Sequence, residues 1–113
     1  MGKVKVDDLV DLGLKPYEAK AVLGLMALPD RQGTSTEIAE TGGLPRTSVY
    51  GTMDGLIKRG LAETVATVGL SKWTVGSWDV LLSRLDWEAN QSLAAYRRRL
   101  RSVAQKVQAG AAR

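Results

Sequence analysis

Apolar residues recur at helical spacing between Arg46 and Arg59, and they predict the helix around which the rest of the chain is organised. The stripe consists of Val49, Met53, Leu56 and Ile57. At 3.6 residues per turn these positions share one face, so we expect them to pack against a core. The opposite face near the helix start is short, hydrogen-bonding and little charged. It consists of Arg46, Thr47, Ser48, Tyr50, Gly51 and Thr52. The exposed side of an ordinary amphipathic helix more usually carries Glu and Lys, so this face is favoured as a binding surface.

A shorter helix is predicted directly before this one. Thr34 and Glu37 have the spacing of a capping box, in which the threonine oxygen accepts an amide hydrogen bond and the glutamate reaches back. Gly42 and Gly43 are expected to end this helix, because glycine adopts the left-handed conformation without a Cβ penalty. Pro45 suits the mouth of the next helix, where its missing N–H costs nothing. A helix, a glycine turn and a second helix predict a helix-turn-helix, whose second helix can enter the DNA major groove.

Two further helices are predicted at the start of the chain. Residues 6–12 are expected to form one or two helical turns that end at Gly13. Pro16 begins a wider apolar helix that runs to about Leu28. Gly24 lies inside that helix and costs about 1 kcal/mol of helix propensity relative to alanine, which predicts a close crossing with another helix. Residues 29–33 are expected to form a loop.

A β-hairpin is predicted after the helix-turn-helix. Residues 61–68 are rich in β-branched side chains, residues 69–71 are turn-like, and residues 72–75 can return as a second strand. Two such short strands are unstable alone in water, so we expect them to lie against the helices as a wing. The wing tip would offer Ser71 and Lys72 to the DNA backbone or the adjacent minor groove. Trp73 is expected to pack the wing onto the body.

A long helix is predicted from Trp78 to about Gly110, with Ser77 as its N-cap. Its apolar positions follow a heptad pattern with one stutter. They are Leu82, Leu85, Ala89, Leu93, Tyr96, Leu100, Val103 and Val107. A helix of this length, about 45 Å at 1.5 Å per residue, is too long for a small body to cover. We therefore expect a homodimer through this helix, with parallel and antiparallel pairing both open, in preference to a lone charged surface helix.

Charge is distributed unevenly along the chain. Residues 1–76 hold nine basic and nine acidic side chains, whereas residues 77–113 hold seven basic and three acidic ones. The helix-turn-helix alone should therefore bind DNA only modestly, because phosphate neutralisation supplies most non-specific affinity. A basic run lies on the long helix and consists of Arg97, Arg98, Arg99 and Arg101. It is interpreted as the solvated flank of the dimer seam, with a patch for DNA or another acidic partner as the alternative.

Several functional classes are disfavoured by composition. The 113 residues include no histidine and no cysteine, which removes the commonest catalytic base, the commonest metal ligand and every thiolate. No phosphate-cradling glycine loop is present. We therefore expect neither an enzyme nor a metal site nor a cofactor. No apolar run has the length of a membrane span, so we expect no membrane partner. The expected location is the cytoplasm, in association with the nucleoid.

Four motifs together resemble the winged-helix domain of the TrmB-like transcriptional regulators. They are Leu12-Gly13-Leu14, Tyr17-Glu18-Ala19, Pro45-Arg46-Thr47-Ser48-Val49-Tyr50 and Lys58-Arg59-Gly60-Leu61. The likeness covers about residues 9–85. The resemblance implies DNA binding through the second helix of the motif and through Lys72 on the wing. Many members carry an additional sugar-binding effector domain, for which this chain has no room, so no small-molecule ligand is expected. The wing also has Thr74 where the family is commonly basic.

The predicted fold is mainly α with a small β-hairpin: a winged helix-turn-helix over residues 1–76, followed by a long dimerisation helix over residues 77–113. The predicted function is a dimeric, double-stranded-DNA-binding transcriptional regulator. Its DNA-binding residues are expected to be Thr36, Arg46, Thr47, Ser48, Tyr50, Thr52, Ser71 and Lys72. Two alternatives keep the fold: a sequence-tolerant architectural DNA-binding protein and a winged helix used for protein contacts.

Overall fold

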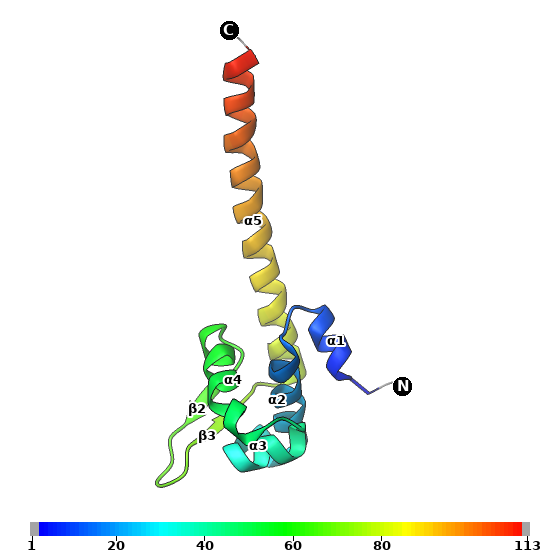
Figure 1. The fold of residues 1–113 in the computed structure, drawn as a ribbon, viewed down its shortest axis with the longest axis vertical. Coiled ribbons are helices and arrows are strands. Elements are labelled where there is room, and N and C mark those ends of the chain that lie inside the picture. The colour runs from blue at the N-terminus through cyan, green and yellow to red at the C-terminus, as the bar shows by residue number, and fades with distance from the viewer. Residues whose placement is uncertain (1–2, 112–113) are drawn as a thin grey trace. The chain divides into compact units, whose positions relative to one another are not determined.

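The structure is a computed structural model that describes residues 3–111. The chain divides into two compact units, one ending at Leu81 and the other beginning at Leu82. The first unit contains the helices α1 to α4 and three short strands, and the second is the greater part of one long helix, α5 (Figure 1). The predicted fold class, mainly helical with a small sheet and a long C-terminal helix, is confirmed.

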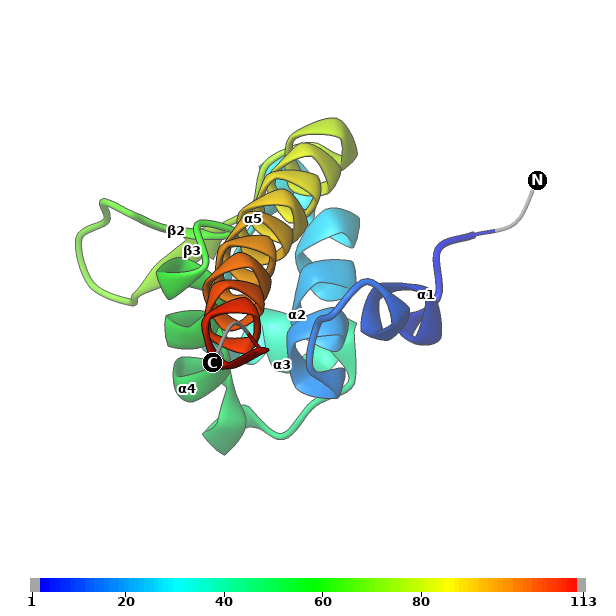
Figure 2. The same cartoon turned by 90° about the horizontal axis from the view of Figure 1, so that it is seen from above.

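The first two helices follow the predicted pattern. Helix α1 spans Val6–Asp11 and α2 spans Pro16–Ala27. Helix α1 packs on α2 (Figure 2) and buries Leu9. Proline at the first position of α2 supplies a preset φ, and the N–H it lacks would have no partner inside the helix. Ala21, Val22 and Leu25 are fully buried, so α2 forms the centre of the core.

The close helix crossing predicted at Gly24 is present. Helix α3 spans Ser35–Gly42 and meets α2 at this glycine. A Cβ built on Gly24 would lie 2.8 Å from the backbone nitrogen of Gly42, and one built on Gly42 would lie 2.5 Å from the carbonyl oxygen of Lys20. Both distances are too short for real atoms. The two helices therefore touch backbone to backbone, which explains a glycine inside a helix.

The predicted capping box begins α3. The Glu37 N–H donates to Thr34 Oγ1 over 3.3 Å, and the Thr34 N–H donates to Glu37 Oε1 over 3.0 Å. The backbone and the hydroxyl of Thr34 hold the pKa of Glu37 below its usual value, and the charge of Lys72 has a smaller effect in the same direction. The helix ends at Gly43, whose φ of 73° is left-handed. Both predicted ends of this helix are confirmed.

Helix α4 spans Arg46–Lys58 and is the second helix of the predicted motif. Val49, Met53 and Leu56 are fully buried along one face, and Ile57 is half-buried. The far end of α4 is tied to α2 by an ion pair, because Arg59 Nη1 lies 3.2 Å from the buried carboxylate of Glu18. These contacts fix the direction in which α4 presents its other face.

The sheet has three strands, one more than the predicted hairpin. Strands β1 (Gln32–Thr34), β2 (Glu63–Val65) and β3 (Lys72–Thr74) are ordered β1-β3-β2 and are antiparallel. The loop predicted over residues 29–33 is therefore wrong in its second half. It consists of a 3-10 turn, Pro29–Arg31, and then the start of β1. The Thr74 hydroxyl donates to the Arg31 carbonyl over 2.9 Å and helps hold this strand in place.

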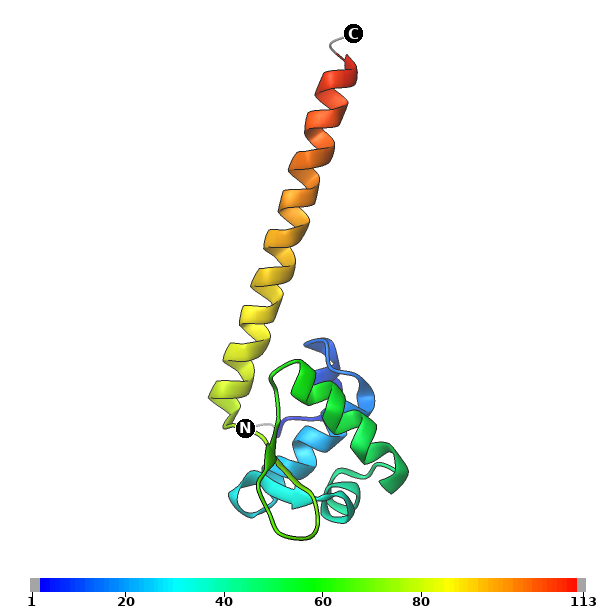
Figure 3. The same cartoon turned by 90° about the vertical axis from the view of Figure 1, so that its left-hand side faces the viewer.

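The wing is shorter in strands and longer in loop than predicted. The strand expected over residues 61–68 is reduced to β2, since Leu61 and Ala62 are buried in the core before the strand begins. The loop between β2 and β3 projects beyond the strands (Figure 3). It is closed by a hydrogen bond that the Thr67 hydroxyl donates to the Leu70 carbonyl over 2.6 Å.

Helix α5 spans Trp78–Ala111 without interruption. Its predicted N-cap is confirmed, because the Val80 N–H donates to Ser77 Oγ over 3.4 Å. Leu85 is only 7% exposed, whereas the other large apolar positions of the predicted seam are at least 45% exposed in this single chain. Within residues 3–111, no helix combines the length and the apolar character that crossing a membrane requires.

Candidate nucleic-acid interface

The first turns of α4 present a polar surface. Arg46 and Thr47 are exposed in the first turn, and Ser48 is half-buried beside them. Pro45 is the N-cap, and its carbonyl accepts the Ser48 N–H over 2.9 Å, so the turn is already formed in the free protein. A helix start also carries a partial positive charge from its unpaired N–H groups. This end of α4 can therefore offer donors and one guanidinium to an anionic or hydrogen-bonding partner.

Tyr50 connects this surface to the wing. Its ring centroid lies 5.0 Å from that of Trp73 in an edge-to-face arrangement with an interplanar angle of 83°. Trp73 is 4% exposed, whereas Tyr50 is 54% exposed. The prediction that Trp73 packs the wing onto the body is confirmed. Part of the Tyr50 ring thus contacts Trp73 while the rest is open to solvent, and this contact helps hold the side chain in place.

A cleft separates α4 from the wing hairpin. It encloses about 450 Å³. Its lining includes Tyr50 and Asp54 from α4 and Ser71 and Lys72 from the hairpin. The cleft therefore joins two of the predicted surfaces, the polar face of α4 and the predicted contacts of the wing.

Asp54 is a residue that the sequence reasoning missed. It is exposed on α4, one helical turn after Tyr50, and so lies on the polar face. A carboxylate repels phosphate groups but can accept a hydrogen bond from the amino group of cytosine. The spacing of four residues from Tyr50 was the signal that could have identified it. This point of the helix is therefore unsuited to a phosphate contact.

The wing tip differs from the predicted polar tip. Ser71 is exposed, but Lys72 is half-buried and lies within β3, opposite Thr34 and Val65. The tip itself presents Val68, which is fully exposed, and Leu70. No charged side chain occurs between Val65 and Ser71. Contacts of this loop with phosphates would therefore depend on hydroxyl and backbone groups.

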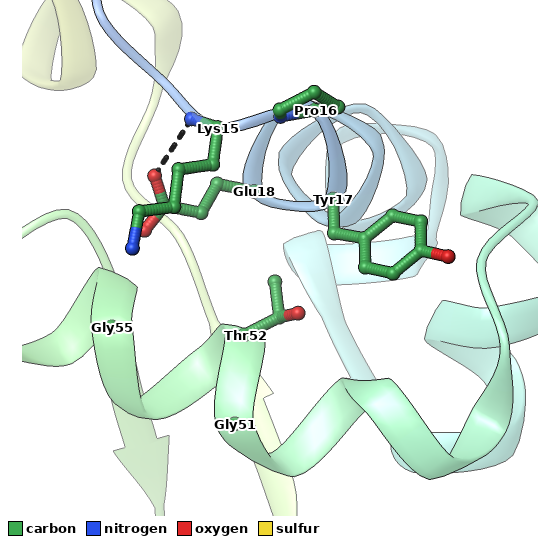
Figure 4. A pocket seen from close by; sticks show the side chains of 7 residues that line it. All are labelled: Lys15, Pro16, Tyr17, Glu18, Gly51, Thr52 and Gly55. Carbon is green, nitrogen blue, oxygen red and sulfur yellow. Dashed lines mark hydrogen bonds between the residues drawn. The ribbon is translucent and has the colours of Figure 1, made fainter.

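Two predicted DNA-binding threonines, Thr36 and Thr52, lie outside the first turn of α4. Thr36 is exposed in the first turn of α3. Thr52 is half-buried and lines a groove of about 460 Å³ between α4 and the start of α2. Figure 4 shows Thr52 and the ring of Tyr17 extending toward each other from the two helices. The structure thus brings Arg46, Thr47, Ser48 and Tyr50 together and places Thr52 on the side of α4 that faces α2.

The groove beside Thr52 offers little chemistry of its own. Its carboxylate, Glu18, accepts the Lys15 N–H over 2.9 Å and is paired with Arg59. Within the described part of the chain, every buried side-chain nitrogen or oxygen has a hydrogen-bond partner. Residues 3–111 also contain no group of three or more acidic side chains placed to hold a metal ion.

The sequence profile of the family described as "Sugar-specific transcriptional regulator TrmB" matches residues 9–68, more than half of the chain. The chain belongs to the TrmB family. The matched region contains α2, α3, α4 and the beginning of the wing, which are the elements that carry the surface described above. The resemblance predicted from four sequence motifs is thereby confirmed. No curated protein matches the sequence.

The solved structures that share the fold include the following three. One is described as TrmBL2, an archaeal chromatin protein with a novel mode of DNA binding; it is 20% identical, with a TM-score of 0.76 over 91% of this chain and 40% of that one. A possible transcriptional regulator from Methanosarcina mazei Go1 is 12% identical, with a TM-score of 0.65 over 89% and 90% of the two chains. A protein from the thermoacidophilic archaeon Sulfolobus tokodaii is 20% identical, with a TM-score of 0.57 over 81% and 99%.

These likenesses establish the winged-helix fold with its long C-terminal helix. At 12% to 20% identity they do not transfer individual residues. The chain spans 40% of the length of TrmBL2. By its description, the TrmB family consists of regulators of transcription.

Proposed function

We propose that the protein is a dimeric transcriptional regulator that reads double-stranded DNA by placing the start of α4 in the major groove. The observation that carries this proposal is the preformed polar face of Arg46, Thr47 and Tyr50 on the second helix of a TrmB-family winged helix. The major groove is wide enough to admit one α-helix. Helix α4 is buried on one side only, so its polar face is available.

Individual roles follow from chemistry. Arg46 is the only basic side chain in the first two turns of α4, and a guanidinium can bind guanine O6 and N7 with two hydrogen bonds or anchor a phosphate. Thr47 and the open face of Tyr50 would contact neighbouring bases or sugars. Asp54, one turn further, suits a cytosine amino group. Ser71 at the wing would approach the DNA backbone next to the groove.

The dimer places two such faces on one duplex. Two-fold symmetry favours an inverted repeat whose half-sites lie about one helical turn, or a multiple of it, apart. Such a protein would reside with chromosomal DNA in the cytoplasm. We assign the basic run of Arg97, Arg98, Arg99 and Arg101 to the solvated flank of the dimer helix, because all four are exposed.

The test is selection of bound duplexes from a random pool, combined with the protein's mass in solution. A recurring inverted repeat and a mass of about twice 12.2 kDa are expected. Recovery of random duplexes with equal affinity would show that the protein does not bind DNA sequence-specifically. A mass of one chain at micromolar concentration would remove the dimer.

A second candidate is a sequence-tolerant architectural protein. The feature that favours it is the likeness to TrmBL2, described as a chromatin protein, together with a wing tip that has no charged side chain. The discriminating measurement is the ratio of affinities for the selected site and for bulk DNA at one salt concentration, since specific binders exceed their own non-specific binding by about 10³-fold or more.

A third candidate is a winged helix that binds another protein, with α5 as the docking element. The balanced charge of residues 1–76 is the feature that favours it. Absence of duplex binding in a gel shift at low salt would select this function over both others.

Replacing all four arginines of the basic run with glutamine tests their assignment. Because each phosphate contact contributes about 0.9 to the slope of log K against log salt for duplex DNA, an unchanged slope is expected for a solvated flank. A slope reduced by one or more would show that the run binds phosphate.

A further inference from the structure

Helix α5 carries an apolar stripe that this single chain leaves open. Leu93, Tyr96, Leu100, Val103 and Val107 are between 45% and 65% exposed. They follow one another at three- and four-residue steps, so they form one continuous stripe along about 21 Å of helix. A stripe that is narrow, regular and apolar is the surface by which one helix packs against another.

The spacing of the stripe residues is the same in both directions along the helix. Ala89, Leu93, Tyr96 and Leu100 are separated by four, three and four residues, a sequence of steps that is unchanged on reversal. The midpoint falls between Ala94 and Ala95. It is also the midpoint of α5, which spans Trp78–Ala111. Other midpoints along a heptad stripe would also allow inversion, but this one gives two copies of α5 their greatest overlap.

Inversion about this midpoint pairs unlike side chains. Leu93 of one copy meets the partner's Tyr96, and Ala89 meets the partner's Leu100. In an antiparallel coiled coil, an a position of one helix packs against a d position of the other, and these pairs have that arrangement. A parallel pair would instead place each large ring of Tyr96 against its own copy in one layer. Pairing of a larger with a smaller residue fills the space more evenly.

The placement of charged residues favours the antiparallel over the parallel orientation. After Glu88 the sequence has no acidic residue, and the arginines lie together over Arg97–Arg101. A parallel pair would bring eight guanidinium groups within about 6 Å along the axis. An antiparallel pair would separate the two clusters by roughly 13 Å, more than the screening length of about 8 Å at physiological salt.

We infer that α5 pairs with α5 of a second copy of this chain in antiparallel orientation, centred between Ala94 and Ala95. The inference rests on the homodimer of the proposed function and adds its orientation and register. The occupant of the stripe is a second copy and not an unrelated protein, because the spacing of the stripe fits its own inverted image and because inversion separates the two arginine clusters.

The chain has no cysteine, so introduced thiols report the pairing without interference. Two single variants, Ala89→Cys and Leu100→Cys, are oxidised separately and as a mixture. A disulfide requires Cα atoms within about 7 Å. In the inferred dimer the two Leu100 positions are roughly 16 Å apart along the axis. The expected result is a crosslinked dimer from the mixture only. Arg98→Cys, on the side opposite the stripe, is the matched control and should not crosslink.

Each other result overturns the inference in a distinguishable way. Crosslinking of Leu100→Cys alone shows parallel pairing, which keeps the homodimer and removes the orientation. A dimer by mass without crosslinks in any sample shows that the chains pair through another surface or in another register, and either removes the inferred pairing. A mass of one chain at micromolar concentration removes the homodimer of the proposed function as well. Helix content, measured by circular dichroism, verifies that each variant is folded.

Discussion

Helices α4 and α5 both carry an apolar stripe, but the stripe of α4 is buried within the chain and that of α5 is exposed. In α4 the stripe of Val49, Met53 and Leu56 is fully buried, and a polar face remains outside. In α5 the stripe from Leu93 to Val107 is about half exposed, and the polar positions around it are mostly basic. Sequence periodicity alone therefore does not say whether a stripe belongs to the core of its own chain.

The difference assigns the two helices to two kinds of contact. A stripe buried within the chain contributes to folding, and it frees the opposite face for a ligand. A stripe left exposed contributes to stability only when a second molecule covers it, since burial of apolar surface is what provides the free energy. Core substitutions in α4 and stripe substitutions in α5 should consequently differ in their dependence on protein concentration.

The largest expected effect is in α4. Leu56→Ala removes a fully buried side chain and should lower the free energy of unfolding by about 2–5 kcal/mol. The loss should be the same at about 1 µM and at about 50 µM protein, because the contact lies within one chain. Leu100→Ala is the matched variant in α5, and its loss should grow with protein concentration. Urea unfolding followed by circular dichroism measures the free energy of unfolding of both variants. The same concentration dependence for the two variants would contradict the difference between α4 and α5.

The next effect is on assembly. Leu93→Glu places a charge in the exposed stripe of α5 and should weaken the dimer by at least about 100-fold, or 2.7 kcal/mol. Sedimentation of the variant should give the mass of one chain. Gln91→Glu adds the same charge on the opposite side of the helix and should leave the dimer intact. A dimer that survives Leu93→Glu would mean that the stripe is not the contact.

A smaller effect is expected on the polar face of α4. Arg46→Ala should weaken binding to a selected duplex by about 1–3 kcal/mol and relax selectivity at one base position. Lys58→Ala, at the far end of the same helix, should change affinity little and selectivity not at all. Fluorescence anisotropy with matched and mismatched duplexes measures both quantities. Equal losses for the two variants would place the start of α4 outside the groove.

The smallest effect should come from Gly51, an exposed glycine inside α4. A Cβ added there meets no other atom within 4 Å, so Gly51→Ala should raise the free energy of unfolding by about 0.5–1 kcal/mol. If α4 enters the groove, the same methyl group lies on the approaching face and should lower DNA affinity. A variant that is more stable and binds DNA equally well would exclude close contact at this position.

The sequence was sufficient for elements whose signals are local. The capping box of Thr34 and Glu37, the left-handed Gly43 and the stripe of α4 all depend on residues within a few positions of each other. Gly24 also predicted its crossing, since a glycine on the apolar face of a helix is favoured where a neighbouring backbone occupies the space of a side chain. In the candidate site, the polar start of α4 followed from the same periodicity.

What the sequence did not reveal depends on distant contacts. Strand β1 is three residues long, contains Gly33 and pairs with β3 about forty positions later, so no alternating pattern indicates it. The strand predicted over residues 61–68 is too long, because β-branched residues continue beyond β2 into the loop. Within the described residues, no strand pairs with that loop. Lys72 reads as a tip residue in the sequence, yet pairing on both sides of β3 draws it into the sheet.

The contact of α2 with α3 at Gly24 and Gly42 has no side chain between the two backbones. Since the contact has no room for even a methyl group, we expect these helices to move together, with the turn that ends at Gly43. A duplex that deviates from ideal geometry cannot be matched by bending them. Accommodation then falls to the exposed loop over residues 66–71 and to the deformability of the DNA itself, which varies with base sequence.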